Sequence, residues 1–217
     1  MPLQWTRSVD NFPSTLSGQW VRRNGGTNPL TSGGMITTNS TSGFFPAEFI
    51  ARPSSGADQY IAVTIAQLHP GTSGGSPSCV VLRSPNNATT GTVPVLFIKN
   101  AQLGIFTMTS WAAAGIVTQS AYANANGGSN MAVGGRIEFW VTNNVYTTAY
   151  NGNVINTWDD SGTLTANQTG RYGAVIMQRA SDGSATGQMG FDDCQFGDFA
   201  PTNVPMPMQA INRPNTY

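Results

Sequence analysis

The sequence contains two glutamates, Glu48 and Glu138, and these are its first candidates for acid–base chemistry. Hydrolysis of a glycosidic bond needs two carboxyl groups flanking that bond, about 5–9.5 Å apart. No spacing in the sequence brings the two glutamates together, so we do not expect a catalytic pair. Glu138 instead precedes Trp140 by two positions, and a strand places both side chains on one face. A carboxylate beside an indole could bind a sugar, and the alternative is an exposed strand face without a ligand.

Other catalytic groups are sparse. The single histidine, His69, precedes Pro70 at the end of a strand-like run, where we expect a capping or surface residue rather than a general base. The sequence has no Gly-x-Ser-x-Gly turn to present a serine nucleophile. Its one lysine, Lys99, does not belong to a glycine-rich phosphate-binding loop. We predict that the protein is not an enzyme and requires no cofactor.

Aromatic side chains are candidates for carbohydrate recognition because a flat ring offers a sugar an apolar platform. Rings of this kind would act together with Asn, Asp and Gln side chains at one end of a sandwich. Each of them could instead belong to the core or to a subunit interface. The candidate ligand-binding residues are Trp140 and Glu138, together with Trp111, Tyr122, Tyr146 and Trp158.

Acidic residues near the two ends of the sequence are candidates for a structural calcium site. Asp192, Asp193 and Asp198 cluster on the last strand-like run, and Ca²⁺ takes about six to eight oxygen ligands. Asp10 would approach them if the first and last strands pair. Neighbouring residues of a strand point to opposite faces, so only one of Asp192 and Asp193 would join a given site. The alternative is that one carboxylate accepts backbone N–H bonds and the other is solvated.

Alternation of apolar and polar residues predicts strands through most of the chain. In residues 60–65, for example, the side chains of Ile61, Val63 and Ile65 share one face. The best helix candidate, residues 111–117, is short and interrupted by glycine. The other predicted strands are Gln19–Arg23, Met35–Asn39, Phe44–Ala51, Ser78–Arg83, Val93–Lys99, Gln102–Thr109, Arg136–Thr142, Val145–Tyr150, Asn153–Trp158, Tyr172–Arg179 and Met189–Phe199.

Two short turns organise the middle of the chain. Asn143-Asn144 and Asn151-Gly152 both suit a type I′ hairpin, because Asn and Gly tolerate positive φ. The span 136–158 is therefore predicted to be a three-stranded meander. About a dozen strands with turns at this spacing are typical of a β-sandwich.

The low content and balanced sign of the charged residues exclude some classes of function. Charged residues make up 9% of the sequence, against about 25% in an average soluble domain. Ten basic and ten acidic residues cancel, and Arg22-Arg23 is the only basic pair. Nucleic-acid binding needs several cations in one patch, so we exclude it. No run approaches the ~18 apolar residues of a membrane helix, so we expect no membrane insertion.

The cysteines and the chain ends add three expectations. Cys79 and Cys194 lie in separate apolar runs, and we predict two buried free thiols rather than a disulfide. The first residues do not look like a signal peptide, so secretion by the usual route is not expected. Residues 200–217 contain four prolines, which disfavour strand pairing and suit an assembly arm or a disordered end. We predict an N-terminal extension (1–8), one domain (9–199) and this arm.

Three segments carry a resemblance to a known family. They are Asp10-Asn11-Phe12 with Leu16-Ser17-Gly18-Gln19-Trp20, the meander Arg136–Trp158, and Gly170-Arg171-Tyr172-Gly173 with the closing run Phe191–Phe199. Together they resemble concanavalin A-like, LamG-like domains, particularly those in minor tail proteins of phages that infect actinobacteria. The resemblance covers residues 9–199. This sequence departs from the family pattern at Asn11, where a second acidic residue is usual, and at Cys194, where a bulkier apolar residue is common.

The resemblance implies an all-β, concanavalin A-like jelly-roll sandwich of two antiparallel sheets. It implies a virion structural protein, a minor tail or tail-tip component, that contacts other virion proteins, forms a homo-oligomer and attaches to a host cell-wall glycan. The alternatives are a head decoration or fibre protein, a stand-alone lectin, and a glycanase. Hydrolases of this fold place Glu-x-Asp-x-x-Glu along one strand, and neither Glu48 nor Glu138 lies in such a pattern.

Overall fold

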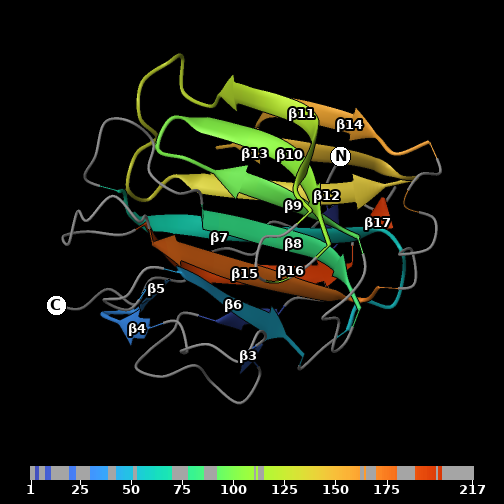
Figure 1. Cartoon of the computed structure of the whole chain (residues 1–217), viewed down its shortest axis with the longest axis horizontal. Helices are drawn as coiled ribbons and strands as arrows, with labels where there is room; N and C mark the ends of the chain where they lie inside the picture. Colours follow the sequence, from blue (N-terminus) through green and yellow to red (C-terminus); the bar gives the residue numbers. More distant parts are fainter. Residues whose placement is uncertain are drawn as a thin grey trace, which may run out of the picture.

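The computed structural model is a sandwich of two antiparallel β-sheets, and its described residues form no α-helix (Figure 1). The predicted all-β jelly-roll class is confirmed. Figure 1 looks down the shortest axis, so the two sheets lie one over the other. No described segment forms a helix long and apolar enough to span a membrane. The structure describes residues 3–4, 8–10, 20–22, 30–38, 43–50, 53–69, 78–85, 92–109, 111, 115–161, 164, 170–179, 189–198 and 200–201.

Each sheet is built by antiparallel pairing alone. The seven-stranded sheet has the order β11 (Val117–Asn124), β10 (Gln102–Met108), β9 (Val93–Ile98), β8 (Ser78–Ser84), β15 (Tyr172–Arg179), β6 (Gly43–Phe49) and β3 (Trp20–Arg22). The eight-stranded sheet has the order β14 (Asn153–Asp159), β13 (Val145–Tyr150), β12 (Arg136–Thr142), β7 (Gln59–Gln67), β16 (Gly190–Asp198), β5 (Met35–Thr37) and β4 (Leu30–Ser32), and β2 (Ser8–Asp10) also pairs with β16.

The main core lies between the two sheets and follows the predicted alternation. Ile61, Val63 and Ile65 of β7 are each 0% exposed, and every second residue of β12 joins them in the same cluster. Burying one such side chain contributes about 1.5–3 kcal/mol. Because side chains alternate along a strand, the intervening residues of β7 and β12 lie on the outer face of the eight-stranded sheet.

The outer face of the seven-stranded sheet is apolar as well. Strands β8, β9, β10 and β15 turn a second set of apolar side chains away from the main core. None of these side chains is more than 7% exposed, so the strands are buried on both faces. This explains their nearly continuous apolar runs. The members are Cys79, Val81, Val93, Val95, Phe97, Phe106, Met108, Trp111, Ala174 and Ile176.

The predicted meander is present as β12, β13 and β14. Its turns have positive φ at Asn143 (48°), Asn144 (66°), Asn151 (49°) and Gly152 (80°), which confirms type I′ hairpins. The sequence offered no helix of useful length, and its best candidate, residues 111–117, ends at the first residue of a strand. That strand is β11, an edge strand in which half of the side chains are exposed and none is buried.

The first and last described segments of the chain pair with each other. Leu3 pairs with Pro201 and Gln4 with Ala200, as strands β1 (Leu3–Gln4) and β17 (Ala200–Pro201). Strand β2 pairs with β16, so the expectation that the first and last strands meet is confirmed. The rest of the predicted arm, 202–217, lies outside the described residues. Cys79 and Cys194 are both free and buried, as predicted.

Candidate functional site

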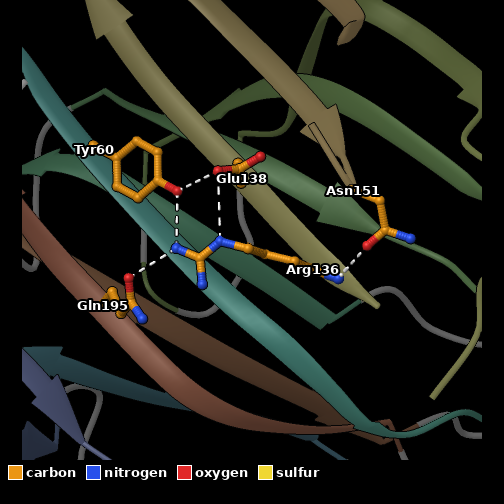
Figure 2. Close-up of polar contacts among 5 residues, drawn as sticks. All are labelled: Tyr60, Arg136, Glu138, Asn151 and Gln195. Carbon is orange, nitrogen blue, oxygen red and sulfur yellow. Dashed lines mark hydrogen bonds and ion pairs between the residues drawn. The ribbon is translucent and has the colours of Figure 1, made fainter. Parts of the chain in front are cut away.

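A polar cluster lies on the outer face of the eight-stranded sheet, where β12, β7 and β16 run side by side (Figure 2). We call it the Arg136 cluster. Arg136 and Glu138 come from β12, Tyr60 from β7 and Gln195 from β16. All four alternate with core residues of their own strands, so the same periodicity that builds the core places them outside.

Hydrogen bonds connect the four side chains into one network. The Tyr60 hydroxyl donates to Glu138 Oε1 (2.5 Å) and accepts from Arg136 Nη2 (3.0 Å). The same Nη2 donates to Gln195 Oε1 (2.8 Å), and Arg136 Nε lies 3.5 Å from Glu138 Oε1. Each side chain is therefore held by at least one other from a neighbouring strand or position, which fixes its orientation before any ligand arrives.

The start of β12 is also anchored to the hairpin beside it. The Arg136 backbone N–H donates to Asn151 Oδ1 (2.8 Å), and the Asn151 N–H donates to the Arg136 carbonyl (2.9 Å). Figure 2 shows Asn151 on the side of Arg136 away from Gln195. The Asn-Gly turn thus sets both the register of the meander and the position of the arginine.

Burial controls the protonation of the network. The Tyr60 side chain is 1% exposed, and this burial raises the pKa of its phenol well above the usual value, with the bond to Glu138 acting in the same direction. The Tyr60 phenol therefore stays protonated and donates a hydrogen bond to the Glu138 carboxylate. The side chains of Arg136 (31% exposed) and Glu138 (15% exposed) remain reachable from solvent.

Three polar groups of the cluster have unused bonding capacity. Among the described residues, no partner contacts Glu138 Oε2, Arg136 Nη1 or Gln195 Nε2. The first is an acceptor and the other two are donors. A ligand with closely spaced hydroxyl groups can use all three, because each hydroxyl both donates and accepts.

Trp140 extends the cluster along β12. Its ring lies nearly parallel to Tyr60, with centroids 6.4 Å apart and an interplanar angle of 23°. Its cross-strand neighbours are Tyr60 on one side and Thr147 on the other, whereas Glu138 lies between Ala62 and Ala149. The predicted pairing of Glu138 with Trp140 on one face is thus present, with small side chains around the carboxylate.

Trp158 and Tyr146 lie on the other face of the same sheet. Tyr146 is 0% exposed and belongs to the main core. Trp158 is half-buried and stacks on it, with centroids 5.0 Å apart and an interplanar angle of 22°. The structure therefore separates Trp158 from Trp140, although both were candidate ligand-binding residues.

Trp111 and Tyr122 belong to the seven-stranded sheet. Trp111 is 3% exposed within the outer apolar cluster, which leaves its ring no free face for a sugar. Tyr122 packs on Phe106 (centroids 5.1 Å apart) and lies under Lys99 Nζ, 4.1 Å from its ring centroid. Neither residue lies near the Arg136 cluster.

The remaining catalytic candidates, Glu48 and His69, do not belong to the Arg136 cluster. Glu48 is 0% exposed on β6 and accepts a hydrogen bond from the Ser84 hydroxyl. It faces outward from the seven-stranded sheet, so the core separates it from Glu138 by more than the ~10 Å between packed sheets. Of the two expectations for His69, a capping or a surface residue, the structure contradicts the second. His69 is 9% exposed, and the Asn100 side chain bonds its backbone N–H and carbonyl.

The acidic candidates surround a bulge in β16. Asp192 pairs with Thr64 and Gln195 with Ala62, so β16 has one extra residue here, and Asp193 has a φ of 46°. Neither aspartate belongs to the core cluster that contains Phe191 and Cys194, and the bulge interrupts the regular alternation on which the expectation of opposite faces depended.

The other two acidic candidates are Asp10, for which only the strand register is described, and Asp198, whose carboxylate is bonded to Ser55 and Gly56. Asp10 is in register with Cys194. Asp198 accepts bonds from Ser55 N (2.7 Å), Ser55 Oγ (2.7 Å) and Gly56 N (3.2 Å). Within the ranges described, no three His, Cys, Asp or Glu side chains form a metal-binding group.

Sequence reasoning missed three of the four members of the Arg136 cluster. Arg136 and Tyr60 could have been found, because each alternates with the predicted core positions of its strand. Gln195 could not be found in this way. Regular alternation from Phe191 would place Gln195 in the core, and only the extra residue of the bulge at Asp193 moves its side chain to the outer face. The cross-strand register, which brings Tyr60 beside Trp140, has no signal in the sequence.

Comparison with solved structures identifies the fold. The carbohydrate recognition domain of Emp46p, in a metal-free form, has a TM-score of 0.62 at 9% identity, over 92% of this chain and 100% of that chain. The exoplasmic/lumenal domain of VIP36, in a form bound to Ca²⁺ and Man3GlcNAc, gives 0.59 at 10% identity (94% and 93% covered). A structure from work on endo-acting O-glycanases of the human gut microbiota gives 0.56 at 11% identity (89% and 99% covered).

The TM-scores, at these low sequence identities, show a shared jelly-roll fold. No protein-family model matches the sequence. No curated protein matches it either.

Proposed function

We propose that this protein is a non-enzymatic carbohydrate-binding domain whose glycan lies on the outer face of the eight-stranded sheet, over the Arg136 cluster and Trp140. The observation that carries the proposal is a fixed acceptor and two fixed donors with unused bonding capacity beside a partly exposed indole. Sugar recognition combines such polar groups with an aromatic platform. The likeness of the fold to carbohydrate recognition domains supports the same function.

The same geometry supports a binding role over hydrolysis. The two glutamates lie on opposite outer faces of the sandwich, so they do not flank one glycosidic bond. Glu138 Oε1 also accepts a hydrogen bond from Tyr60 and lies 3.5 Å from Arg136 Nε, so this oxygen is already engaged within the cluster. Incubation with bound glycans is expected to release no reducing ends, and release that disappears in Glu138→Gln would establish a glycanase instead.

Glu138→Gln tests the site directly. The substitution keeps the shape of the side chain and removes the charged acceptor, so we expect affinity to fall about 10- to 100-fold. The measurement is isothermal titration with the neutral oligosaccharide that binds most tightly in a broad glycan panel. Asp159→Asn is the matched control, because it removes an exposed carboxylate from β14, outside the cluster, and should leave affinity unchanged. A panel without any binder would refute the function, and unchanged affinity in Glu138→Gln would move the site.

We further propose that the domain belongs to a phage virion, as a minor tail or tail-tip protein that attaches to a host cell-wall glycan. The pairing of residues 3–4 with 200–201 brings these two segments side by side, which is consistent with attachment to a neighbouring virion protein at one place. The sparse charge and the resemblance to tail proteins support it as well. Mass spectrometry of purified virions tests it, and absence of the chain would favour a stand-alone lectin.

A further inference from the structure

The charges of the sandwich are divided between its two sheets. Among the residues described, Arg136 is the only basic residue in the strands of the eight-stranded sheet, whereas Arg22, Arg83 and Arg179 lie in strands of the other sheet. The carboxylates show the reverse distribution. Only Glu48 lies in a strand of the seven-stranded sheet, and the eight-stranded sheet contains Asp10, Glu138, Asp159, Asp192, Asp193 and Asp198.

Around the proposed glycan site this imbalance is not neutralised. Arg136 Nε and Glu138 Oε1 lie 3.5 Å apart, so the opposite charges of the two side chains cancel. Asp192 and Asp193 form no ion pair with any residue in the described ranges, and their one side-chain bond there is internal, from the Asp193 N–H to Asp192 Oδ1 (2.7 Å). Both side chains are partly exposed, and burial together with the neighbouring Asp193 carboxylate raises the pKa of Asp192.

The strand register places this negative charge beside the Arg136 cluster. Thr64 of β7 pairs with Arg136 on one side and with Asp192 on the other. Two strand spacings separate the backbones of Arg136 and Asp192, which is about 10 Å. This spacing is about one Debye length at 0.1 M salt, so a ligand over the Arg136 cluster is exposed to the charge of both aspartates when the salt concentration is low.

We infer that the site selects uncharged glycans, and that Asp192 and Asp193 are the residues that exclude glycans carrying carboxylate or sulfate groups. The inference rests on the proposed function and specifies its ligand class. Two unit charges about 10 Å from a ligand anion oppose its binding about threefold at about 10 mM salt. The guanidinium of Arg136 does not offset this effect, because Glu138 already neutralises it.

The test compares two forms of one oligosaccharide. The first is the neutral oligosaccharide that binds most tightly in the panel, and the second is the same compound after its primary hydroxyl groups are oxidised to carboxylates. At about 10 mM salt, the full chain is expected to bind the neutral form about threefold more tightly. In about 1 M salt the ratio should approach one, because the Debye length falls from about 30 Å to about 3 Å.

The double variant Asp192→Asn/Asp193→Asn assigns the effect. Asparagine keeps the acceptor at position 192 and tolerates the positive φ at position 193, so the bulge should be retained. The variant is expected to bind both forms within twofold, with neutral affinity unchanged, whereas Asp159→Asn should keep the full discrimination. Equal binding of both forms by the unaltered chain, or full discrimination by the double variant, would overturn the inference. If no neutral oligosaccharide binds at all, the proposed function itself is overturned.

Discussion

Trp140→Ala is expected to weaken glycan binding at least about 30-fold while changing stability little. The Trp140 ring is partly exposed on the outer face and lies next to the unused acceptor of Glu138. Truncating a central aromatic of a binding site costs about 2 kcal/mol or more, which corresponds to this factor. Trp140 does not belong to the main core, so the loss should appear chiefly in affinity. Isothermal titration and thermal unfolding measure the two quantities separately.

Trp158→Ala is the matched control, because it removes the same side chain from the inner face of the same sheet. Trp158 stacks on the buried Tyr146, so its loss should destabilise the fold by about 2–4 kcal/mol. The folded fraction should still bind glycan with the original affinity. The account would be contradicted if Trp158→Ala lost binding and Trp140→Ala kept it, since the platform would then lie at the β14 edge.

Gly170→Ala is expected to destabilise the sandwich by about 3 kcal/mol or more. A Cβ at this position would lie 1.9 Å from the Arg83 carbonyl oxygen and 2.4 Å from its carbon, which are backbone atoms with little freedom to move. Gln59 holds the two segments together, because its amide donates to the Gly170 carbonyl (2.7 Å) and accepts from the Arg83 N–H (2.8 Å). Relieving the clash would break this connection between β7, β8 and the start of β15.

Gly56→Ala is the corresponding control for the added methyl group. The nearest atom to a Cβ there is Asp58 N at 3.9 Å, so the stability should change by less than about 0.5 kcal/mol. Urea unfolding followed by tryptophan fluorescence gives both values. Equal midpoints for the two variants would show that the segment at Gly170 adjusts without cost and that the close approach to Arg83 is not structural.

The fold was largely predictable because most strands have one face in the core. Alternation in β7 and β12 identified the inner positions, and Asn-Gly chemistry identified the hairpin at Asn151. Strand β11 escaped prediction because it is an edge strand, with Val117 55% exposed and no regular apolar face. Where burial does not impose a pattern on the residues, the sequence contains no pattern to find.

The candidate site was predictable only within one strand. Glu138 and Trp140 share a face because they are two positions apart, and this requires no knowledge of the neighbours. Tyr60 and Gln195 join them through the register of β7 and the bulge in β16, which depend on tertiary pairing. The same limit explains Trp158, whose residue type suited a ligand platform but whose strand turns it towards Tyr146.

The central claim is that glycan binds over the Arg136 cluster, and nitrogen-15 NMR titration with the tightest neutral oligosaccharide tests it most directly. The sequence has five tryptophans, so five indole N–H signals can be followed together with the Arg136 Nε–H signal. The account predicts saturable shifts of the Trp140 indole and of Arg136 Nε–H, while the buried Trp20 and Trp111 signals stay in place. Saturable shifts that leave Trp140 and Arg136 unmoved would contradict it.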